Sequence, residues 1–505
     1  MTTLLLHNAS VLTMDPARPR ASAVLVRDDR IAAVGGVDIT PTPRRGLRTL
    51  DCRGAMLVPG FHDAHLHLLG LASRLLAVDC SSSRSIPELA ATIRSASANV
   101  PAGRWLRSWG YHETALAERR HPTRADLDAA APDHLLILAH RSGHAHVLNS
   151  AALRAAGITG STPDPDDGVI ARDEHGVPTG LLFEMGAWLD RRVPRLSDAE
   201  LRNGVRKANR LLLSRGVTTI HDATPANNLA RWELFQRLAA DGVLTVRCVF
   251  MPGIDQVSAF VDAGLAYGAG NHRLSVGAAK MMLTTTTGAL YPSSDVLPAH
   301  ASAAAAAGFP VAIHAVEAEA VAAASEVIVA VRGLRPGLRH RIEHASECPP
   351  HVLEAVRRSG AVVVTNPGFI HHSGDRYLAE VAKDLQPWLY RIGALHRAGV
   401  TVAFGSDAPV ELPDPIVQVS AAVTRRSSSG QAVGEFEAVN METALRMHTV
   451  AGSHASGLET RSGVIAPDMP ADLVLLDGDP LRASPDALMG MRILKTLVGG
   501  EESDS

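Results

Sequence analysis

Two histidines separated by a single residue follow an apolar stretch early in the chain. The stretch Ala55–Val58 is followed by Pro59 and Gly60, and then by His65 and His67. Side chains two residues apart in a strand point to the same side, so both imidazoles are expected to face one point at a strand end. Neutral imidazoles are ligands for Zn²⁺ and neighbouring divalent ions. The pair therefore predicts part of a metal site.

Four further residues with ligand chemistry lie at or just beyond the ends of other short apolar runs: Lys280, His314, His344 and Asp407. A His-x-His pair alone is usually an exposed pair without a metal. One residue with ligand chemistry at each of several strand ends is instead typical of the carboxyl-terminal mouth of a parallel barrel. A metal ion there lowers the pKa of bound water to about 7 and supplies hydroxide at neutral pH. We expect Asp407 to hold that water and to carry its proton to the leaving group.

Lys280 is one of only four lysines in a chain whose other basic residues are arginines. A protonated ammonium would repel a cation, so as a ligand this lysine must be neutral or carbamylated by CO₂. A carbamylated lysine would bridge two metal ions. The alternative is a lysine that reaches from the strand end to solvent. The sequence thus does not decide between a site with one metal ion and a site with two.

The periodicity of the chain predicts strands alternating with helices, an α/β fold. With residues 55–58 as the first strand, eight parallel strands are expected, which is the number that closes a (β/α)8 TIM barrel. The other seven are residues 217–222, 244–250, 274–283, 309–314, 340–344, 361–365 and 401–407.

Short strands are also predicted at both ends of the chain, at residues 3–12, 22–35, 462–465, 471–477 and 492–498. They predict a small composite β-sandwich from residues 1–54 and 455–505, beside a metal-dependent barrel at 55–454. The gap after the first barrel strand is too long for one crossover helix. An insertion at about 73–205, attached to a βα loop, is therefore expected to cover the active site.

Several residues outside the ligand set are candidates for supporting roles. We expect His144 and Asn149 on the insertion to contact the substrate, together with two residues on barrel loops, His221 and His371. The alternative for each is an ordinary loop residue. Glu343 and Asp222 are candidates for orienting the ligand imidazoles, because metal-bound histidines commonly donate their other N–H to an oxygen.

Composition narrows the classes of function. With 505 residues, 46% hydrophobic and 20% charged, the chain is an ordinary globular protein, and a net charge of −3 with acids and bases interspersed favours neither nucleic acid nor an anionic membrane as a partner. The four cysteines are scattered, so structural disulfides are not expected. The start of the chain does not resemble a signal peptide, and no apolar run approaches the ~20 residues of a membrane span. We expect a soluble cytoplasmic protein that acts on a small molecule; its oligomeric state stays open, with a homo-oligomer among the alternatives.

In this order, the motifs resemble those of the amidohydrolase superfamily: residues 58–67, Lys280, His314-Ala315, residues 341–344 and Ser406-Asp407. Residues 142–149 and 176–184 extend the resemblance to amidohydrolase family 3, whose YtcJ-like branch is similar to N-substituted formamide deformylase. The resemblance implies a zinc-dependent hydrolase with a barrel and a composite β-sandwich. It implies the following ligands and roles: His65, His67, His314, His344 and Asp407 as metal ligands, Lys280 as the carbamylated bridge, and Asp407 as general base.

We therefore expect a metal-dependent amidohydrolase that cleaves a carbon–nitrogen bond of a small amide, formamide or related molecule by metal-activated hydroxide. A non-hydrolytic enzyme of the superfamily, a decarboxylase or isomerase, is the alternative within enzymes. A catalytically inactive metal-binding scaffold is the alternative outside them, and the presence of all six strand-end residues argues against it. Residues 281–288 and 316–319 depart from the usual family pattern beside the pocket, so the sequence does not name the substrate.

Overall fold

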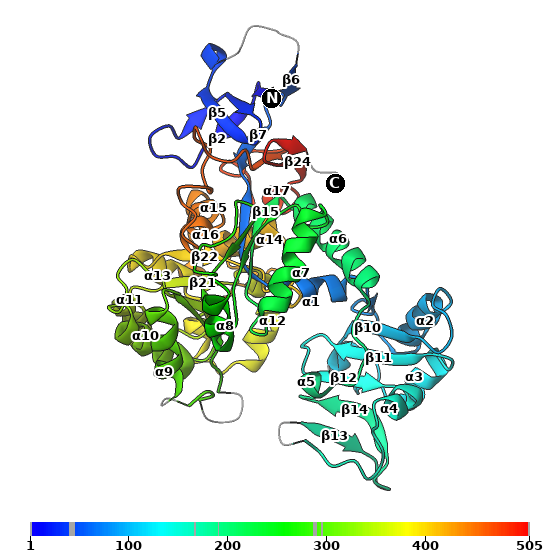
Figure 1. The fold of residues 1–505 in the computed structure, drawn as a ribbon. Helices are drawn as coiled ribbons and strands as arrows, with labels where there is room; N and C mark the ends of the chain where they lie inside the picture. The colour runs from blue at the N-terminus through cyan, green and yellow to red at the C-terminus, as the bar shows by residue number, and fades with distance from the viewer. Residues whose placement is uncertain are drawn as a thin grey trace. The chain divides into compact units, whose positions relative to one another are not determined.

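The computed structural model describes residues 3–39, 46–165, 168–189, 191–285, 290–293 and 296–502. The chain divides into two compact units (Figure 1). The first unit comprises Met1–Leu68 and Asn209–Ser505, and the second comprises Leu69–Ala208. The domain boundaries expected from the sequence stay a prediction. Within the described ranges, no helix is both long enough and apolar enough to cross a membrane.

In the first unit, strands from both ends of the chain form two sheets. One has the order β5-β4-β1-β6, with bounds β1 (Thr3–His7), β4 (Ala23–Arg27), β5 (Arg30–Gly35) and β6 (Leu47–Asp51). The other has the order β25-β24-β23-β7-β2-β3, with bounds β2 (Ser10–Leu12), β3 (Arg20–Ala21), β7 (Met56–Pro59), β23 (Leu473–Leu476), β24 (Ile493–Val498) and β25 (Glu501–Glu502). Figure 1 shows β24 from the C-terminal end beside the N-terminal strands. Residues 462–465, expected as a strand, form none here.

The core of these sheets is aliphatic. Val11, Leu57 and Leu473 are fully buried and belong to one hydrophobic cluster that joins residues from both ends of the chain. Burying each such side chain contributes roughly 1.5–3 kcal/mol. The two ends of the sequence are therefore held together by packing as well as by strand pairing.

The stretch Ala55–Val58, expected as the first barrel strand, belongs instead to these terminal sheets. Its residues 56–58 lie in β7, which pairs with β2 and β23. The parallel sheet begins only at β8 (Phe61–Leu66), which pairs with β15 (Val217–Asp222). Between them, a Cβ on Gly60 would lie 2.1 Å from Oγ1 of Thr218, so only glycine fits where the chain passes from one sheet to the other.

Nine strand segments form two parallel sheets. The first has the order β17-β16-β15-β8, with β16 (Arg247–Phe250) and β17 (Leu274–Val276). The second has the order β18-β19-β20-β21-β22, with bounds β18 (Ala279–Met282), β19 (Val311–Ala315), β20 (Arg341–His344), β21 (Val362–Thr365) and β22 (Val402–Phe404). Almost every residue in them is buried, as expected for parallel strands covered on both faces.

The expected strand 274–283 is split between the two sheets at Gly277, where a Cβ would lie 2.7 Å from Val249. Backbone hydrogen bonds nevertheless connect the sheets at both edges. The N–H of Lys280 donates to the carbonyl of Pro252 at 2.7 Å, and the N–H of Asp407 donates to the carbonyl of His65 at 2.7 Å. The second bond joins the end of β8 to the segment that follows β22.

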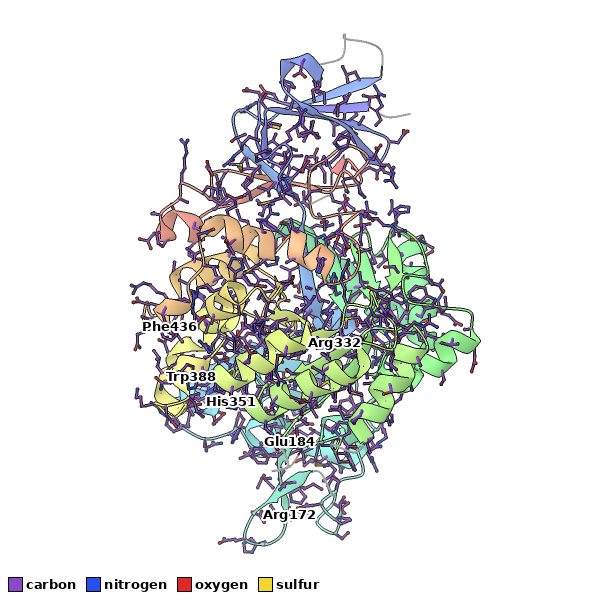
Figure 2. All side chains as sticks on the ribbon, turned by 90° about the vertical axis from the view of Figure 1, so that its left-hand side faces the viewer. Arg172, Glu184, Arg332, His351, Trp388 and Phe436 are labelled. Atoms are coloured by element: carbon purple, nitrogen blue, oxygen red, sulfur yellow. The ribbon has the colours of Figure 1, made fainter. Side chains whose placement is uncertain are left out.

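Most helices of the first unit follow a parallel strand, and α17 follows β23 of the terminal sheet. Their bounds are α7 (Leu229–Ala240), α8 (Val257–Asp262), α9 (Val296–Ala306), α10 (Ala318–Val331), α11 (Pro350–Ser359), α12 (Gly368–Glu380), α13 (Ile392–Arg397), α14 (Pro415–Thr424), α15 (Met441–Met447), α16 (Val450–His454) and α17 (Pro485–Met489). Their polar residues face outward: Arg332 after α10 and His351 on α11 are exposed (Figure 2). Burying one face of each helix provides most of its stability.

The second unit is built on a mixed sheet of order β13-β14-β12-β11-β10-β9. Its bounds are β9 (Val78–Asp79), β10 (Trp105–Tyr111), β11 (Leu135–His140), β12 (Ala145–Leu148), β13 (Val169–Arg172) and β14 (Pro178–Phe183). Strands β9, β10 and β11 are parallel, and the others pair antiparallel. Its helices are α2 (Ile86–Ser97), α3 (Arg124–Ala130), α4 (Ser150–Ala155) and α5 (Gly186–Leu189), while α1 (Leu68–Arg74) and α6 (Asp198–Ser214) extend across the unit boundaries.

Candidate metal centre

Four of the six predicted ligands converge at the carboxyl ends of β8, β20 and β22. Nε2 of His65 and Nε2 of His67 lie 3.5 Å and 3.2 Å from Oδ1 of Asp407. The ring centroids of His65 and His344 are 4.7 Å apart. One ligand atom each from His65, His344 and Asp407 lies within 4.8 Å of the others, a grouping that could hold a metal ion.

Neighbouring oxygens orient these three imidazoles. Nδ1 of His344 lies 2.7 Å from Oδ1 of Asn366, and Nδ1 of His67 lies 3.2 Å from Oγ1 of Thr224. Nδ1 of His65 contacts a carboxylate oxygen of Glu343. A ring that donates its Nδ1–H to an oxygen keeps the lone pair of Nε2 for a metal. The donor set therefore fits a divalent ion.

The two remaining predicted ligands lie beside this group. The ring centroid of His314, on β19, is 4.5 Å from that of His344. Lys280, on β18, is fully buried, and its Nζ has no hydrogen-bond partner among the described residues. Burial lowers the pKa of this amine to about 8. A buried amine without a hydrogen-bond partner fits a position beside a metal ion or a covalent modification.

The protonation states suit metal binding. Burial holds the pKa of His65 and His344 below the usual value, so both rings are neutral at neutral pH. Burial alone would raise the pKa of Asp407. A hydrogen bond from His67 and the electrostatic effect of the nearby His344 outweigh the effect of burial, so the pKa of Asp407 is lowered. Neutral imidazoles and a carboxylate are the forms that coordinate metal ions.

Two of the candidate ligands have unusual backbone geometry. His344 has φ 72° and Asp407 has φ 59°, in the left-handed region that non-glycine residues rarely adopt. Such residues cost roughly 1–3 kcal/mol each and cluster at functional sites. The residue types at these two positions do not indicate this backbone conformation.

The residues expected to orient the imidazoles divide into two groups. Glu343 contacts His65 directly, as proposed from the sequence. Asp222 contacts no imidazole in the described structure: it accepts hydrogen bonds from the N–H of Leu68 at 2.8 Å and from Nδ2 of Asn227 at 2.8 Å. It therefore anchors the backbone next to His67. Asn366, which orients His344, was not anticipated from the sequence, because a lone asparagine after a strand has no distinguishing pattern.

The four expected substrate contacts lie in different environments. His221, on β15, is fully buried with Nδ1 3.0 Å from the guanidinium of Arg341, and His371 lies on α12. In the second unit, His144 is exposed and pairs with Glu184 at 3.0 Å.

Asn149, the fourth expected substrate contact, is fully buried in the second unit. Its side-chain oxygen accepts from the N–H groups of Leu136 and Ala152, and its Nδ2 donates to the carbonyl of His134 at 2.8 Å. These bonds cap α4 and attach it to β11. These contacts give Asn149 a structural role, and its contact with the substrate stays a prediction.

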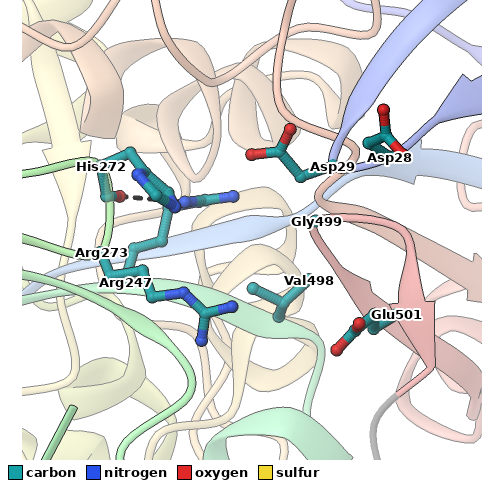
Figure 3. Close-up of a pocket in the computed structure, with 8 residues that line it drawn as sticks. All are labelled: Asp28, Asp29, Arg247, His272, Arg273, Val498, Gly499 and Glu501. Atoms are coloured by element: carbon teal, nitrogen blue, oxygen red, sulfur yellow. Dashed lines mark hydrogen bonds between the residues drawn. The ribbon is translucent and has the colours of Figure 1, made fainter. Parts of the chain in front are cut away.

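A pocket of about 250 Å³ lies at the opposite end of the strands (Figure 3). Arg247, the first residue of β16, lines it together with Asp28, Asp29, His272, Arg273, Val498, Gly499 and Glu501. The guanidinium of Arg247 forms a buried two-bond pair with Asp472, at 2.5 and 2.9 Å. The charge of this arginine is therefore already compensated, and the pocket is separate from the carboxyl ends that carry the candidate ligands.

The sequence profile of the amidohydrolase family matches residues 48–503. The chain belongs to the amidohydrolase family. This confirms the family and the class of hydrolase expected from the motifs. N-substituted formamide deformylase of Arthrobacter pascens is 31% identical to this amidohydrolase, over 99% of this chain and 98% of that protein. The YtcJ protein of Bacillus subtilis (strain 168) is 28% identical, over 98% of each chain.

A solved structure described as an uncharacterized metal-dependent hydrolase from Pyrococcus horikoshii OT3 superimposes on this amidohydrolase with a TM-score of 0.78. It covers 96% of this chain and 99% of its own, at 24% sequence identity. At that identity the likeness establishes the fold. The α/β architecture expected from the sequence is thus confirmed at the level of an amidohydrolase-type fold.

Proposed function

We propose that this amidohydrolase uses a divalent metal ion, Zn²⁺, to hydrolyse a carbon–nitrogen bond of a small molecule. The observation that carries the proposal is the convergence of His65, His67, His344 and Asp407, with Nδ1 of each ring next to an oxygen. His314 completes the imidazole set beside His344. A cluster of neutral imidazoles and one carboxylate is the ligand chemistry of hydrolytic zinc sites.

Each residue of the site has a defined task in this proposal. His65, His67, His314 and His344 hold the ion, which when bound acts as a Lewis acid that polarises the substrate carbonyl and activates water. Asp407 accepts a proton from the attacking water and delivers it to the leaving nitrogen as the carbon–nitrogen bond breaks. Its lowered pKa keeps it ionised, and so able to accept that proton, at neutral pH.

We propose that Lys280 is carbamylated. The neutral amine attacks CO₂, one N–C bond forms and one proton is released to solvent, leaving a carbamate. Three features support this step: complete burial, an Nζ without a hydrogen-bond partner among the described residues, and a pKa lowered to about 8 that increases the fraction of reactive neutral amine. A carbamate would provide the oxygen ligands for a second ion.

We also propose that the two parallel sheets close into a (β/α)8 barrel with the ligands at its carboxyl-terminal mouth. The edge-to-edge bonds from Lys280 N–H to Pro252 and from Asp407 N–H to His65 support closure on both sides. The family match supports it further, since closed barrels carry active sites at that face.

N-substituted formamides are the substrate class to test first, because the relative that is 31% identical acts on that class by name. The chain, stripped of metal with a chelator and reloaded with Zn²⁺, is incubated with N-alkyl and N-aryl formamides in ¹⁸O-labelled water. We expect metal-dependent release of formate that carries solvent oxygen. A metal-dependent product without solvent oxygen would instead indicate a non-hydrolytic reaction.

Variants then assign the roles. We expect Asp407→Asn to lower kcat by at least about 100-fold, whereas Asp384→Asn, which changes an exposed carboxylate, leaves kcat unchanged. Lys280→Met is expected to bind one metal ion fewer per chain than the wild-type protein. Equal metal content in both proteins would contradict the carbamate bridge, and unchanged kcat in Asp407→Asn would contradict the proton transfer.

A further inference from the structure

A second group of metal-ligating side chains lies in the second unit, where the proposed function assigns no role. His112 and Glu113 follow the end of β10, and His140 is the last residue of β11. These two strands are parallel neighbours, with Tyr111 paired to His140. The carboxyl ends of adjacent parallel strands are the usual location of ligand sites in open α/β sheets.

The side chains are close enough to share one ion. One ligand atom from each of His112, Glu113 and His140 lies within 4.8 Å of the others. The ring centroids of His112 and His140 are 5.2 Å apart, and Nε2 of His140 lies 2.9 Å from Oε2 of Glu113. Zinc bonds of 2.0–2.1 Å in a tetrahedral site place ligand atoms about 3.3 Å apart.

The two closest atoms are buried and lack hydrogen bonds. Among the described residues, neither Nε2 of His140 nor Oε2 of Glu113 has a hydrogen-bond partner, although they approach to 2.9 Å. The whole of His140 is only 9% exposed. Their contact is an ion pair without hydrogen-bond geometry, and an ion bound by both atoms would satisfy both.

Neighbouring hydroxyls can hold the rings in the required tautomer. Nδ1 of His112 lies 2.7 Å from Oγ1 of Thr114, and Nδ1 of His140 lies 2.7 Å from Oγ of Ser142. The N–H of Ser142 also approaches Nδ1 of His140, at 3.1 Å. In the tautomer that binds a metal through Nε2, Nδ1 of His140 carries the proton and donates to the hydroxyl of Ser142, and the bond from the N–H of Ser142 is lost. Nε2 is then free for a metal.

We propose that His112, Glu113 and His140 form a second divalent-metal site, of the Zn²⁺ and Co²⁺ class, within the second unit. Two imidazoles and one carboxylate provide three ligands and leave the fourth position open to water. His121 lines the same group: its Nδ1 lies 2.9 Å from the hydroxyl of Tyr111 and 4.0 Å from Oε2 of Glu113. All of these residues belong to the second unit, whereas the candidate metal centre lies wholly in the first.

The test compares the zinc content of two full-length double variants. One carries Glu113→Gln and His140→Asn; the control carries Glu174→Gln and His175→Asn, which alter an exposed His–Glu pair of the same unit. Each protein is stripped of metal and titrated with Zn²⁺ against a chromophoric chelator. We expect the cluster variant to bind one Zn²⁺ fewer per chain than the control. Equal numbers and affinities would overturn the proposal. Because both variants retain every residue of the candidate metal centre, this difference is independent of the proposed function.

A milder variant covers the case in which the double variant does not fold. His112 is only half-buried, so His112→Asn is expected to preserve the fold. We expect this variant to bind one Zn²⁺ equivalent with an affinity at least about tenfold lower than the wild-type protein. We also expect weaker visible absorption from one Co²⁺ equivalent. Zinc affinity and cobalt absorption identical to the wild-type protein would reject His112 as a ligand, and with it the proposed site.

Discussion

Arg341 and Glu343, two residues apart on β20, form a fully buried ion pair with two hydrogen bonds. Nε of Arg341 donates to Oε1 of Glu343 at 2.8 Å, and its second terminal nitrogen donates to Oε2 at 2.9 Å. Oε2 also contacts Nδ1 of His65. The arginine further donates to the carbonyl of Ala64 at 2.7 Å. A continuous chain of contacts thus leads from the arginine, through the carboxylate, to a candidate metal ligand.

Replacing Arg341 by methionine is expected to damage both stability and the metal centre. Removing one partner of a buried ion pair leaves an uncompensated charge and costs about 3–5 kcal/mol. The free carboxylate of Glu343 would also no longer hold the ring of His65. We expect a lower free energy of unfolding in urea and weaker Zn²⁺ binding in a chelator titration.

The control is Arg339→Met, because Arg339 pairs with Glu459 in a partly exposed setting. Such pairs contribute about 0–1 kcal/mol, so little change is expected. A double variant with Arg341→Met and Glu343→Gln has no uncompensated carboxylate, so it should be more stable than the Arg341→Met variant alone. Equal stability of the Arg341 and Arg339 variants would contradict this account of the pair.

The sequence predicted which residues come together better than it predicted the strands that carry them. His65, His67, His344 and Asp407 were recognisable because each follows an apolar run, and the structure brings them together. Their assignment as ligands nonetheless remains a proposal. The first strand was misplaced because residues 55–58 are the apolar run, whereas residues 61–66, which include His62, Asp63 and His65, are buried without being apolar. Hydrophobicity alone does not reveal that the former pairs with the terminal sheet.

Other features left no pattern in the sequence. The division of the stretch 274–283 into β17 and β18 depends on a close backbone approach at Gly277, which is a tertiary effect. Asn366 and Thr224 contact ligand imidazoles from loops after other strands, where single polar residues are common. The left-handed backbone of His344 likewise arises from the folded context and not from its residue type.

Asn366 is expected to set the metal affinity more than the stability of the fold. Its Oδ1 lies 2.7 Å from Nδ1 of His344, and its Nδ2 donates to the carbonyl of Gly405 at 2.8 Å. Loss of such a supporting contact commonly costs 10–100-fold in metal affinity. We therefore expect Asn366→Ala to raise the Kd for Zn²⁺ by about 10–100-fold. The control is Asn209→Ala, a buried asparagine that bonds the backbone at Thr245; it should lower stability and leave the Kd unchanged. A Kd for Zn²⁺ that rises more in Asn209→Ala than in Asn366→Ala would reject an orienting role for Asn366.

Gly405 is expected to tolerate no side chain. A Cβ at this position would lie 2.6 Å from Cβ and 2.7 Å from the backbone nitrogen of His65. Overpacking of this kind typically costs about 1–3 kcal/mol, and here the strain falls between two segments that carry candidate ligands. We expect Gly405→Ala to lower both the thermal midpoint and the Zn²⁺ affinity. Gly333→Ala is the control, since the described residues leave open space around Gly333. A Gly405→Ala protein with wild-type midpoint and affinity would contradict the close packing.

His448 is expected to make the fold sensitive to acid. Its Nδ1 donates to the carbonyl of His62 at 2.9 Å, and the ring packs edge-on against Phe61 and Phe404. Burial lowers the pKa of His448 from 6.5 to about 4. As the pH falls below 6.5 the unfolded chain takes up a proton that the folded chain does not, so stability is lost between pH 6.5 and 4. The expected slope is about 1.4 kcal/mol per pH unit.

His448→Asn keeps a donor near the carbonyl of His62 but cannot titrate in this range. We expect this variant to be less stable at pH 7, because asparagine fills less of the apolar pocket, yet to lose less stability on acidification than the wild-type protein. His351→Asn, at an exposed position on α11, is the control and should follow the wild-type curve (Figure 2). Free energies of unfolding from urea titrations between pH 4 and pH 7 provide the measurement. If the His448→Asn curve ran parallel to that of the wild-type protein, burial of a neutral ring at this position would not be a source of the acid sensitivity.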